Sequence, residues 1–209
     1  MINSFLKKVF YLIFRDKKQI EFARKFIHIS SILLPLSYRY LFNNNKQVTI
    51  LVFLVLVIIS MAIELLRLEN KNFRKYFYFI FGVMLRRHEI QNFTGASYLL
   101  ISAIVCIAFF PADIAFVAMA FLSIGDTFAA LIGINFGKRK FKSSKKSFEG
   151  TLACFASTFL FGIFFIPLAI ALTGAIAASI AELINIPIDD NVKIPVLSCI
   201  VMSLTYIIA

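Results

Sequence analysis

The sequence has few of the residues that build metal clusters, cross-links or acidic surfaces. Its 209 residues include three cysteines and 11 aspartate or glutamate residues, against 22 lysine or arginine residues. Cys106, Cys154 and Cys199 lie far apart within apolar runs and show no metal-ligand spacing, so we interpret them as small buried hydrophobic residues. The N-terminus lacks an apolar run followed by a small-residue cleavage site, so we expect no removable signal peptide.

Apolar residues are present in excess. They make up 60% of the chain, which contains 25 phenylalanines and has a mean hydropathy of +0.87. A soluble domain is usually about half apolar, so the excess is expected to face lipid. Runs such as Val48–Leu66 and 151–172 have the length of a helix that crosses a bilayer. These features predict an all-α, polytopic integral membrane protein.

The basic residues are gathered in three groups. The formal net charge is +11. The groups precede the first apolar run (Lys7, Lys8, Arg15, Lys17, Lys18, Arg24 and Lys25), follow the second (Arg67, Lys71, Arg74, Lys75, Arg86 and Arg87) and follow the fourth (Lys138, Arg139, Lys140, Lys142, Lys145 and Lys146). Basic clusters separated by apolar spans are typical of cytoplasmic loops. We therefore expect a multi-pass protein of the cell (inner, cytoplasmic) membrane and exclude nucleic acid as a partner.

The apolar runs predict about seven crossings. The expected spans are 27–42, 48–66, 95–110, 114–134, 151–172, 175–186 and 196–208. The run 76–85 is too short to cross at 1.5 Å per residue, so we expect it in the interface or packed under other helices. The short stretch 175–186 is the weakest of the predicted crossings.

The chain divides into an N-terminal segment and one catalytic domain. In residues 1–25, Phe5, Val9, Leu12 and Ile13 share one helical face, which predicts an amphipathic helix lying on the membrane surface. No internal repeat or linker interrupts residues 26–209, so we expect a single multi-span domain there. The number of copies in the functional unit stays open, and an oligomer is possible.

Asp126 stands inside a long apolar run. A carboxylate near the bilayer centre costs roughly 2.5–3.5 kcal/mol, so such an acid is a candidate functional residue. Ala130, Gly133 and Gly137 follow it on the same helical face. Small residues at this spacing are also typical of close helix packing. Packing alone does not explain a carboxylate at the head of the stripe with cations behind it, whereas a metal-bound polyphosphate explains both.

The segment after this helix reads KKSFEGT, from Lys145 to Thr151. Lysines bind phosphate oxygens, Glu149 suits a metal or a sugar hydroxyl, and Gly150-Thr151 is expected to open the next helix with free N–H groups. A solvated basic loop, with Glu149 stabilising a helix N-terminus, is the alternative. Residues 135–151 are thus a predicted cytoplasmic nucleotide-binding loop. The predicted binding residues are Gly133, Gly137, Lys138, Lys145, Lys146, Ser147, Glu149, Gly150 and Thr151.

The ordered motifs resemble a known enzyme group. GDTFAALIGINFGK at 125–138 followed by KKSFEGT is similar to the signature shared by phosphatidate cytidylyltransferases and the CTP-dependent dolichol/phytol/diacylglycerol kinase group. Arg24-Lys25-Phe26-Ile27-His28 resembles the RKxxH motif of the kinases, and Asp189-Asp190-Asn191 with Pro195 resembles their DDNxxxP element. The histidine, paired glycines and D-R-x-D cluster of the cytidylyltransferases do not occur in this sequence.

The resemblance implies CTP as phosphoryl donor, Mg²⁺ as cofactor and an isoprenoid alcohol (phytol, geranylgeraniol, polyprenol or dolichol) or diacylglycerol as substrate. Our hypothesis assigns Asp126, Glu149 and Asp189 to the metal. Asp126, Asp190, His28 and Arg24 are the predicted catalytic residues, with Asp190 as a candidate base. Synthesis of CDP-diacylglycerol from phosphatidate is the first alternative. An ion-coupled transporter that uses Asp126 and Glu182 is the second.

Several of these residues have a purely structural alternative. Arg24 can extend to lipid headgroups beside a packed His28. Glu64 and Arg67 also resemble positions of the kinase group, but at three residues apart they are typical of an ion pair within a helix. Asp189 and Asp190 can belong to a polar turn bounded by prolines.

Overall fold

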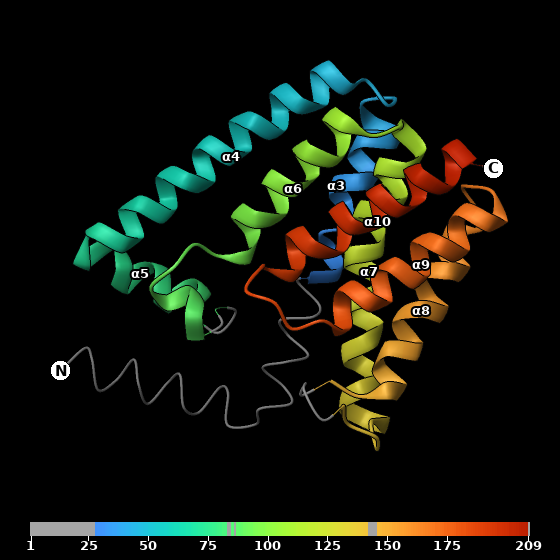
Figure 1. Ribbon diagram of the computed structural model, residues 1–209. Helices are drawn as coiled ribbons and strands as arrows, with labels where there is room; N and C mark the ends of the chain where they lie inside the picture. Colours follow the sequence, from blue (N-terminus) through green and yellow to red (C-terminus); the bar gives the residue numbers. More distant parts are fainter. Residues whose placement is uncertain (1–27, 83–84, 86, 142–145, 209) are drawn as a thin grey trace.

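The computed structural model describes residues 28–82, 85, 87–141 and 146–208. The predicted N-terminal helix in 1–25, Arg24 and Lys145 lie outside the described residues. The elements in chain order are α3 (Leu33–Leu36), the π-helical turn η1 (Ser37–Leu41), α4 (Lys46–Glu69), α5 (Lys71–Phe81), the 3₁₀ turn η2 (Arg87–Ile90), α6 (Gly95–Phe109), α7 (Ala112–Phe136), α8 (Phe148–Gly162), α9 (Leu168–Leu183) and α10 (Asp190–Ile208) (Figure 1).

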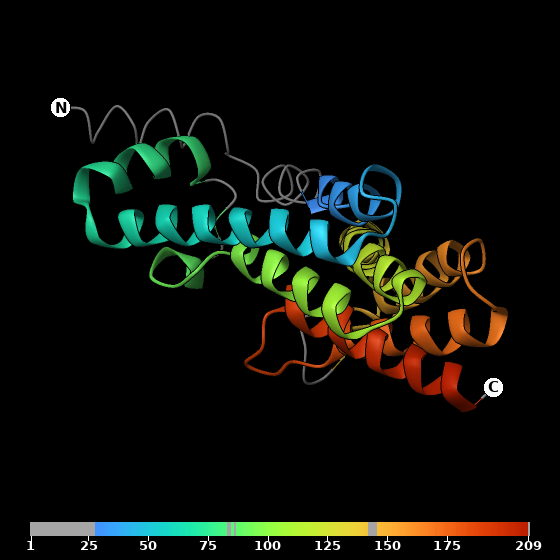
Figure 2. The same cartoon turned by 90° about the horizontal axis from the view of Figure 1, so that it is seen from above.

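The helix α7 forms the centre of the molecule. It contacts α8, α9, α10, α6 and α3, and these helices surround it in Figures 1 and 2. Within its most apolar stretch 78% of the residues are buried, whereas in α4 only 17% are. Because α7 carries Asp126, the sequence motif of greatest interest lies in the protein interior rather than on the lipid-facing surface.

The prediction of an all-α, polytopic membrane protein is confirmed. Among the described residues, α4, α7 and α10 are long and apolar enough to cross a membrane, and α6, α8 and α9 are shorter apolar helices. The 24 residues of α4 extend over about 36 Å, which exceeds a hydrocarbon core of about 30 Å. Leu51, Leu54 and Ile58 of α4 are exposed, as expected for side chains that face lipid.

The chain turns between η1 and α4, in the gap between the predicted spans 27–42 and 48–66. Asn43 and Asn44 adopt positive φ angles of 48° and 58°, a conformation that asparagine tolerates better than most residues. Asn45 then caps α4, because its side chain accepts a hydrogen bond from Val48 N at 3.1 Å. Pro111 is the N-cap of α7 and lies in the gap between the predicted spans 95–110 and 114–134.

The predicted spans 151–172 and 175–186 are wrong in their boundaries. The helix α8 ends at Gly162, and α9 begins after Pro167 and continues to Leu183. Proline has no N–H to donate and is tolerated at the start of a helix, so Pro167 separates two helices where hydropathy alone suggests one long run.

The last helix also begins earlier than predicted, at Asp190 rather than Val196, and it contains Pro195. Without an N–H, Pro195 cannot bond to the carbonyl of Asn191 one turn earlier. That carbonyl instead accepts a hydrogen bond of 2.7 Å from Ser102 Oγ of α6. The carbonyl that Pro195 leaves without a partner inside the helix therefore forms a hydrogen bond that connects α10 to α6.

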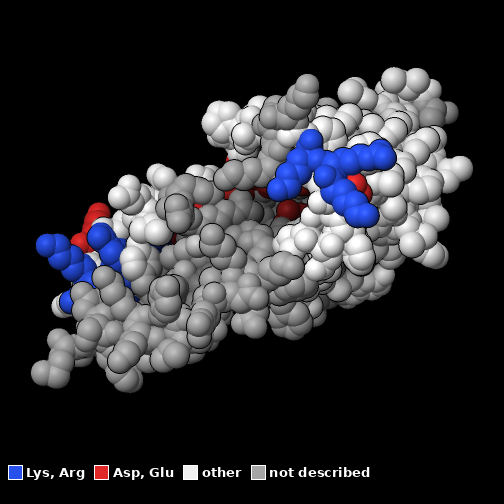
Figure 3. Space-filling view, turned by 90° about the horizontal axis from the view of Figure 1, so that it is seen from below, with Lys and Arg blue, Asp and Glu red and all other residues white. Residues whose placement is uncertain are grey.

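The short helix α5 packs against the end of α4. Arg74 donates to the carbonyls of Arg67 and Leu68 in the last turn of α4, and Tyr78 OH donates to Ile90 O at 2.8 Å. Among the described residues, α5 has 11 residues and is not one of the helices long enough to cross a membrane, as expected for the run 76–85. Figure 3 shows two groups of basic side chains on one face of the molecule, as expected for the residues near the α4–α5 junction and for those that follow α7.

Candidate active site

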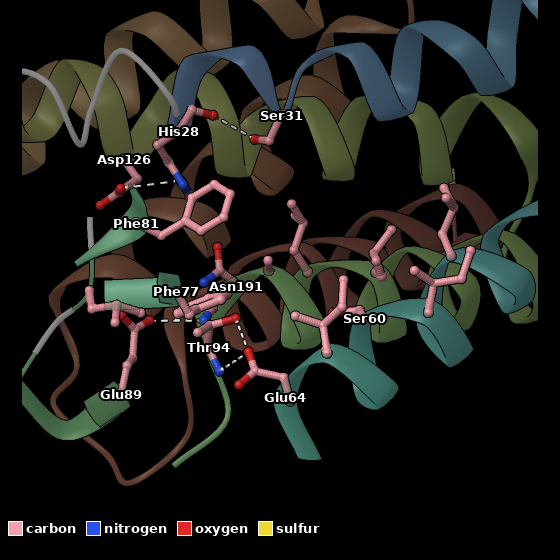
Figure 4. Close-up of a pocket in the computed structure, with 18 of the residues that line it drawn as sticks. His28, Ser31, Ser60, Glu64, Phe77, Phe81, Glu89, Thr94, Asp126 and Asn191 are labelled. Atoms are coloured by element: carbon pink, nitrogen blue, oxygen red, sulfur yellow. Dashed lines mark hydrogen bonds and ion pairs between the residues drawn. The ribbon is translucent and has the colours of Figure 1, made fainter. Parts of the chain in front are cut away.

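Asp126 and His28 form a pair beside the central helix. The Nε2 atom of His28 lies 3.2 Å from Oδ2 of Asp126, although the two residues are 98 positions apart. Ser31 Oγ and Ser123 Oγ, 2.6 Å apart, connect the same two segments one turn away. Two residues that the sequence marked as separate candidates are thus brought together by the packing of the first apolar segment on α7 (Figure 4).

The pair opens into a cavity of about 580 Å³ between α4, α5 and α6. Most of its polar residues gather at one end: His28, Asp126, Glu64, Glu89, Thr94 and Asn191. Ser31 and Ser60 also line it, farther along its length. The remaining walls are mostly aliphatic and aromatic: Leu56, Ile59, Ile63, Phe73, Phe77, Phe81, Leu85, Leu99 and Leu100. An apolar cavity with a few convergent polar groups is the usual form of a small-molecule site.

Glu64 and Arg67 build the polar end of the cavity. They form the expected ion pair within α4, with Arg67 Nη2 2.5 Å from Glu64 Oε2. Arg67 also donates to the carbonyls of Glu89, Ile90 and Asn92, and Glu64 Oε1 accepts from Thr94 N at 3.1 Å and Thr94 Oγ1 at 2.5 Å. Arg67 is fully buried. The pair therefore orders the connection that leads into α6.

The start of α6 packs tightly against the start of α10. Gly95 N donates to Glu89 Oε1 at 2.8 Å. A Cβ at Gly95 would lie 2.6 Å from Nδ2 of Asn191, so only glycine fits there without a shift. The carboxylate oxygen Oδ1 of Asp189 accepts from both the backbone and the side-chain nitrogen of Asn191. This geometry agrees with the polar-turn interpretation of Asp189.

A second charged cluster brings together the chain just before α8, the end of α9 and the first turn of α10. Lys146 Nζ is 3.1 Å from Glu182 Oε1 and 3.4 Å from Asp190 Oδ2, and it also donates to Glu182 O. Lys193 Nζ contacts Asp190 Oδ1 at 2.7 Å and Ile184 O at 2.6 Å. We call Lys146, Glu182, Asp190 and Lys193 the lysine–carboxylate cluster.

Charge governs the protonation of Lys146. Burial by itself lowers the pKa of this lysine, but the carboxylates of Glu182 and Asp190 more than offset burial, so its pKa is raised. The negative charge of Asp126 also raises the pKa of Lys146, so the two side chains interact electrostatically. Lys146 is therefore an ammonium ion at neutral pH, as phosphate binding requires.

The glycines of the predicted nucleotide loop serve close packing. A Cβ at Gly150 would lie 2.7 Å from Ala129 O, and one at Gly137 would lie 2.6 Å from Ser147 Oγ. Gly133 likewise faces Ser147 and Gly150. The contacts of these glycines agree with the alternative that small residues allow close helix packing.

Ser147 caps α8, which corrects the expectation of free N–H groups there. Its Oγ accepts from Gly150 N at 3.1 Å, and its carbonyl accepts from Thr151 N at 3.0 Å. The loop folds back on itself, since Phe148 N donates to Arg139 O at 2.8 Å. Both oxygens of Glu149 accept from Arg139 N at 3.3 Å. These contacts fit the alternative of Glu149 as a stabilising charge near the start of α8.

The predicted metal ligands are not gathered into one group. Within residues 28–141 and 146–208, apart from the undescribed positions between 83 and 86, no set of three or more His, Cys, Asp or Glu side chains is placed to hold a metal ion. Asp126 lies on α7, Glu149 at the start of α8 and Asp189 before α10. Their joint role as metal ligands stays a prediction.

Two charged residues of the cluster were not among the predicted site residues. Glu182 is buried in α9, and its Oε2 has no hydrogen-bond partner among the described residues. Lys193 follows Asp190 by three positions in α10 and is also buried. A carboxylate in an alanine-rich apolar helix was the available signal for Glu182. Lys193 carried no comparable signal.

Comparison with known proteins identifies the family. The model of the Cytidylyltransferase family matches residues 6–208, which is nearly the whole chain. This chain belongs to the cytidylyltransferase family. The match extends over both the cavity and the lysine–carboxylate cluster. No solved structure matches the chain.

Three proteins are similar in sequence to most of this chain. The chain is 28% identical to CTP-dependent diacylglycerol kinase 1 of Eremothecium gossypii over 87% of this chain and 66% of that one. It is 27% identical to CTP-dependent diacylglycerol kinase 1 of Saccharomyces cerevisiae over 88% and 72%. It is also 27% identical to an uncharacterized protein of Rickettsia prowazekii over 86% and 92%. The chain thus spans about two thirds of the length of the two kinases.

Proposed function

We propose that this protein is a CTP-dependent lipid-alcohol kinase that transfers the γ-phosphoryl group of CTP to the hydroxyl of a membrane lipid. The observation that carries the proposal is the position of Asp126. It lines the apolar cavity with His28, and its negative charge also acts on Lys146 of the lysine–carboxylate cluster. An apolar acceptor and an anionic donor can therefore meet at one carboxylate. The names of the two yeast relatives support the same activity.

The transfer forms one bond and breaks one. The alcohol oxygen bonds to the γ-phosphorus, the bond from that phosphorus to the β–γ bridging oxygen breaks, and CDP leaves. The hydroxyl proton needs an acceptor at the cavity. We assign this task to the His28–Asp126 pair rather than to Asp190, because both oxygens of Asp190 already contact lysine ammonium groups.

The triphosphate is assigned to the cationic side of α7. Lys146 supplies a charge at the rim of the cluster, and Lys138 is an exposed cation at the end of α7. Phosphoryl transfer depends mainly on positioning and on neutralising the charge of the phosphates. When CTP binds, Lys146 exchanges part of its contact with Glu182 and Asp190 for phosphate oxygens. Lys145 and Arg24 belong to the same proposal through the sequence motifs that contain them.

The residues near Lys146 fit a magnesium ion brought in with the nucleotide. Mg²⁺ is usually held by one or two carboxylates, with phosphate oxygens and water completing the shell. Asp126 and Glu182 would hold it here, because both act electrostatically on Lys146 and the Oε2 atom of Glu182 is buried without a hydrogen-bond partner among the described residues. A bound Mg²⁺ would neutralise charge on the phosphates.

The acceptor is proposed to be an isoprenoid alcohol such as phytol, geranylgeraniol or a polyprenol, or a diacylglycerol. The apolar walls of the cavity support any of these tails. The basic clusters of the sequence support a reaction on the cytoplasmic face of the cell membrane, where CTP is available. An ion-coupled transporter gains no support from a family match that concerns nucleotide chemistry.

The family name itself favours one competing activity, the synthesis of CDP-diacylglycerol from phosphatidate. The two reactions differ in which phosphorus enters the lipid. Purified protein is offered CTP labelled at either the α or the γ phosphorus, with phytol, geranylgeraniol, a polyprenol, diacylglycerol or phosphatidate. The kinase predicts γ label in the lipid and none from the α position. Label from the α position in a lipid made from phosphatidate would replace the kinase with the cytidylyltransferase.

A further inference from the structure

The cavity between α4, α5 and α6 has the size of one hydrocarbon chain. Its volume is about 580 Å³, and at about 30 Å³ for each water-sized group it holds roughly 20 such groups. A lipid with two long chains exceeds this space. The cavity therefore matches a single long alkyl or isoprenoid chain.

In the described part of the protein, most polar groups that line the cavity lie at one end. Glu64 and Thr94 lie at the same end as the His28–Asp126 pair (Figure 4). Leu56 lies eight residues from Glu64 along α4, or about 12 Å at 1.5 Å per residue. Leu100 of α6 also lines the cavity, five residues beyond Gly95. These two leucines form the end that is farthest from the carboxylates.

One wall of the cavity is a stripe of aromatic rings. Phe73, Phe77 and Phe81 recur every four residues on α5, so they share one face of the helix. The Phe73 and Phe77 ring centroids are 6.5 Å apart, and those of Phe77 and Phe81 are 5.0 Å apart. Across the cavity, Leu56 and Ile59 of α4 are only partly buried, at 39% and 50% exposed. In a spanning helix such side chains meet lipid rather than water, so the cavity opens toward the bilayer.

From this geometry we propose that the cavity binds one hydrocarbon chain of the acceptor, with the hydroxyl at the His28–Asp126 end and the far part of the chain at Leu56 and Leu100. These two leucines set the chain length that the site accepts. A second chain, where the lipid has one, stays in the bilayer. This inference rests on the proposed kinase function for the identity of the acceptor, but the cavity can be tested without turnover.

The first experiment maps the chain directly. A C16–C20 alcohol with a diazirine at its far end is cross-linked to the purified wild-type protein, and the labelled peptides are identified by mass spectrometry. The expected labels lie on α4 around Leu56 and on α6 around Leu100. Labels confined to α8, α9 or the outer face of α4 would overturn the inference. Labels at Leu56 and Leu100 without transfer from γ-labelled CTP would keep the cavity and overturn the kinase.

The second experiment shortens the cavity. Leu56→Trp fills its far end, whereas Ile58→Trp adds the same ring two residues away on the same helix, outside the lining. Leu56→Trp should lower transfer to a C20 alcohol about tenfold or more, while transfer to a C10 alcohol changes less than about twofold. Ile58→Trp should change neither. An equal loss for both alcohols, or the same chain-length profile in both variants, would contradict the proposal.

Discussion

Two charged groups lie near Asp126, the Glu64–Arg67 pair and the lysine–carboxylate cluster, and they are built differently. On the cavity side, Arg67 is fully buried and its guanidinium is occupied by Glu64 and three backbone carbonyls. In the lysine–carboxylate cluster, the side chain of Lys146 is 31% exposed and Oε2 of Glu182 has no hydrogen-bond partner among the described residues. The first group has its hydrogen-bonding capacity satisfied and orders the chain. The second has capacity left for a ligand.

The largest effect is expected at the residue between the two groups. Asp126→Asn keeps the shape of the side chain but removes its charge, so transfer should fall by about 10³-fold or more. The measurement is turnover of γ-labelled CTP by purified protein with a C20 alcohol. Asp113→Asn, at the exposed far end of α7, is the matched control and should keep normal activity. Near-normal turnover in Asp126→Asn would refute its assignment.

Substitutions in the Glu64–Arg67 pair should mainly lower the stability of the fold. Arg67→Met leaves Glu64 buried without its partner, so unfolding should become easier by about 3–5 kcal/mol. The pair of Arg39 and Asp113, 2.7 Å apart with side chains 24% and 59% exposed, offers a comparison. Asp113→Asn should cost only about 1 kcal/mol, because the Asp113 carboxylate is largely exposed and such a pair contributes little. Thermal unfolding in detergent measures both. Equal losses would show that burial does not distinguish the two pairs.

Substitutions in the lysine–carboxylate cluster should mainly weaken the binding of CTP. Lys146→Ala removes a charge-assisted contact to phosphate, so KM for CTP should rise by about 10- to 100-fold. Lys140→Ala removes an exposed lysine of the same loop and should change KM less than about twofold. Steady-state kinetics at several CTP concentrations measures the difference. An equal change in KM in the two variants would mean that Lys146 has no specific role in CTP binding and belongs to a solvated basic loop.

The smallest effect is expected where a glycine serves packing. In Gly150→Ala the new Cβ would lie 2.7 Å from Ala129 O, so α7 and α8 must separate slightly at a cost of about 1–3 kcal/mol. Because its N–H is already bonded to Ser147, KM for CTP should stay close to that of the wild type. Thermal unfolding and CTP kinetics together check this. A large rise in KM with unchanged stability would return Gly150 to the nucleotide site.

The helices were predictable where hydropathy and turn residues agree. The predicted spans 48–66 and 114–134 lie inside α4 and α7, because Asn45 and Pro111 mark their starts as clearly as the apolar runs do. The run 151–172 misled because hydropathy continues unbroken across the end of α8. Pro167 was the relevant signal, and its effect on hydrogen bonding outweighs the apolar character of its neighbours.

The sequence allowed several residues of the site to be predicted, but not the contacts between them. Asp126 stood out because a carboxylate is expensive among apolar side chains, Lys146 because it lies in the lysine-rich segment after that helix, and His28 through the resemblance of the Arg24–His28 motif. Their contacts join positions far apart in the chain, 98 residues for His28 and Asp126. Such pairs depend on how helices pack, which the local pattern does not encode. Glu64 and Arg67 could be paired from their spacing, whereas the carbonyls that Arg67 also binds could not.

The central claim is that Asp126 and Lys146 act on one bound triphosphate, and a double-mutant cycle tests it most directly. Equilibrium affinity for CTP with Mg²⁺ is measured in the wild type, Asp126→Asn, Lys146→Ala and the double variant. A shared ligand predicts coupling, so the double variant should lose about threefold less or more than the product of the single losses. Strictly multiplicative losses would mean that the two residues do not hold the same molecule, and would contradict the account.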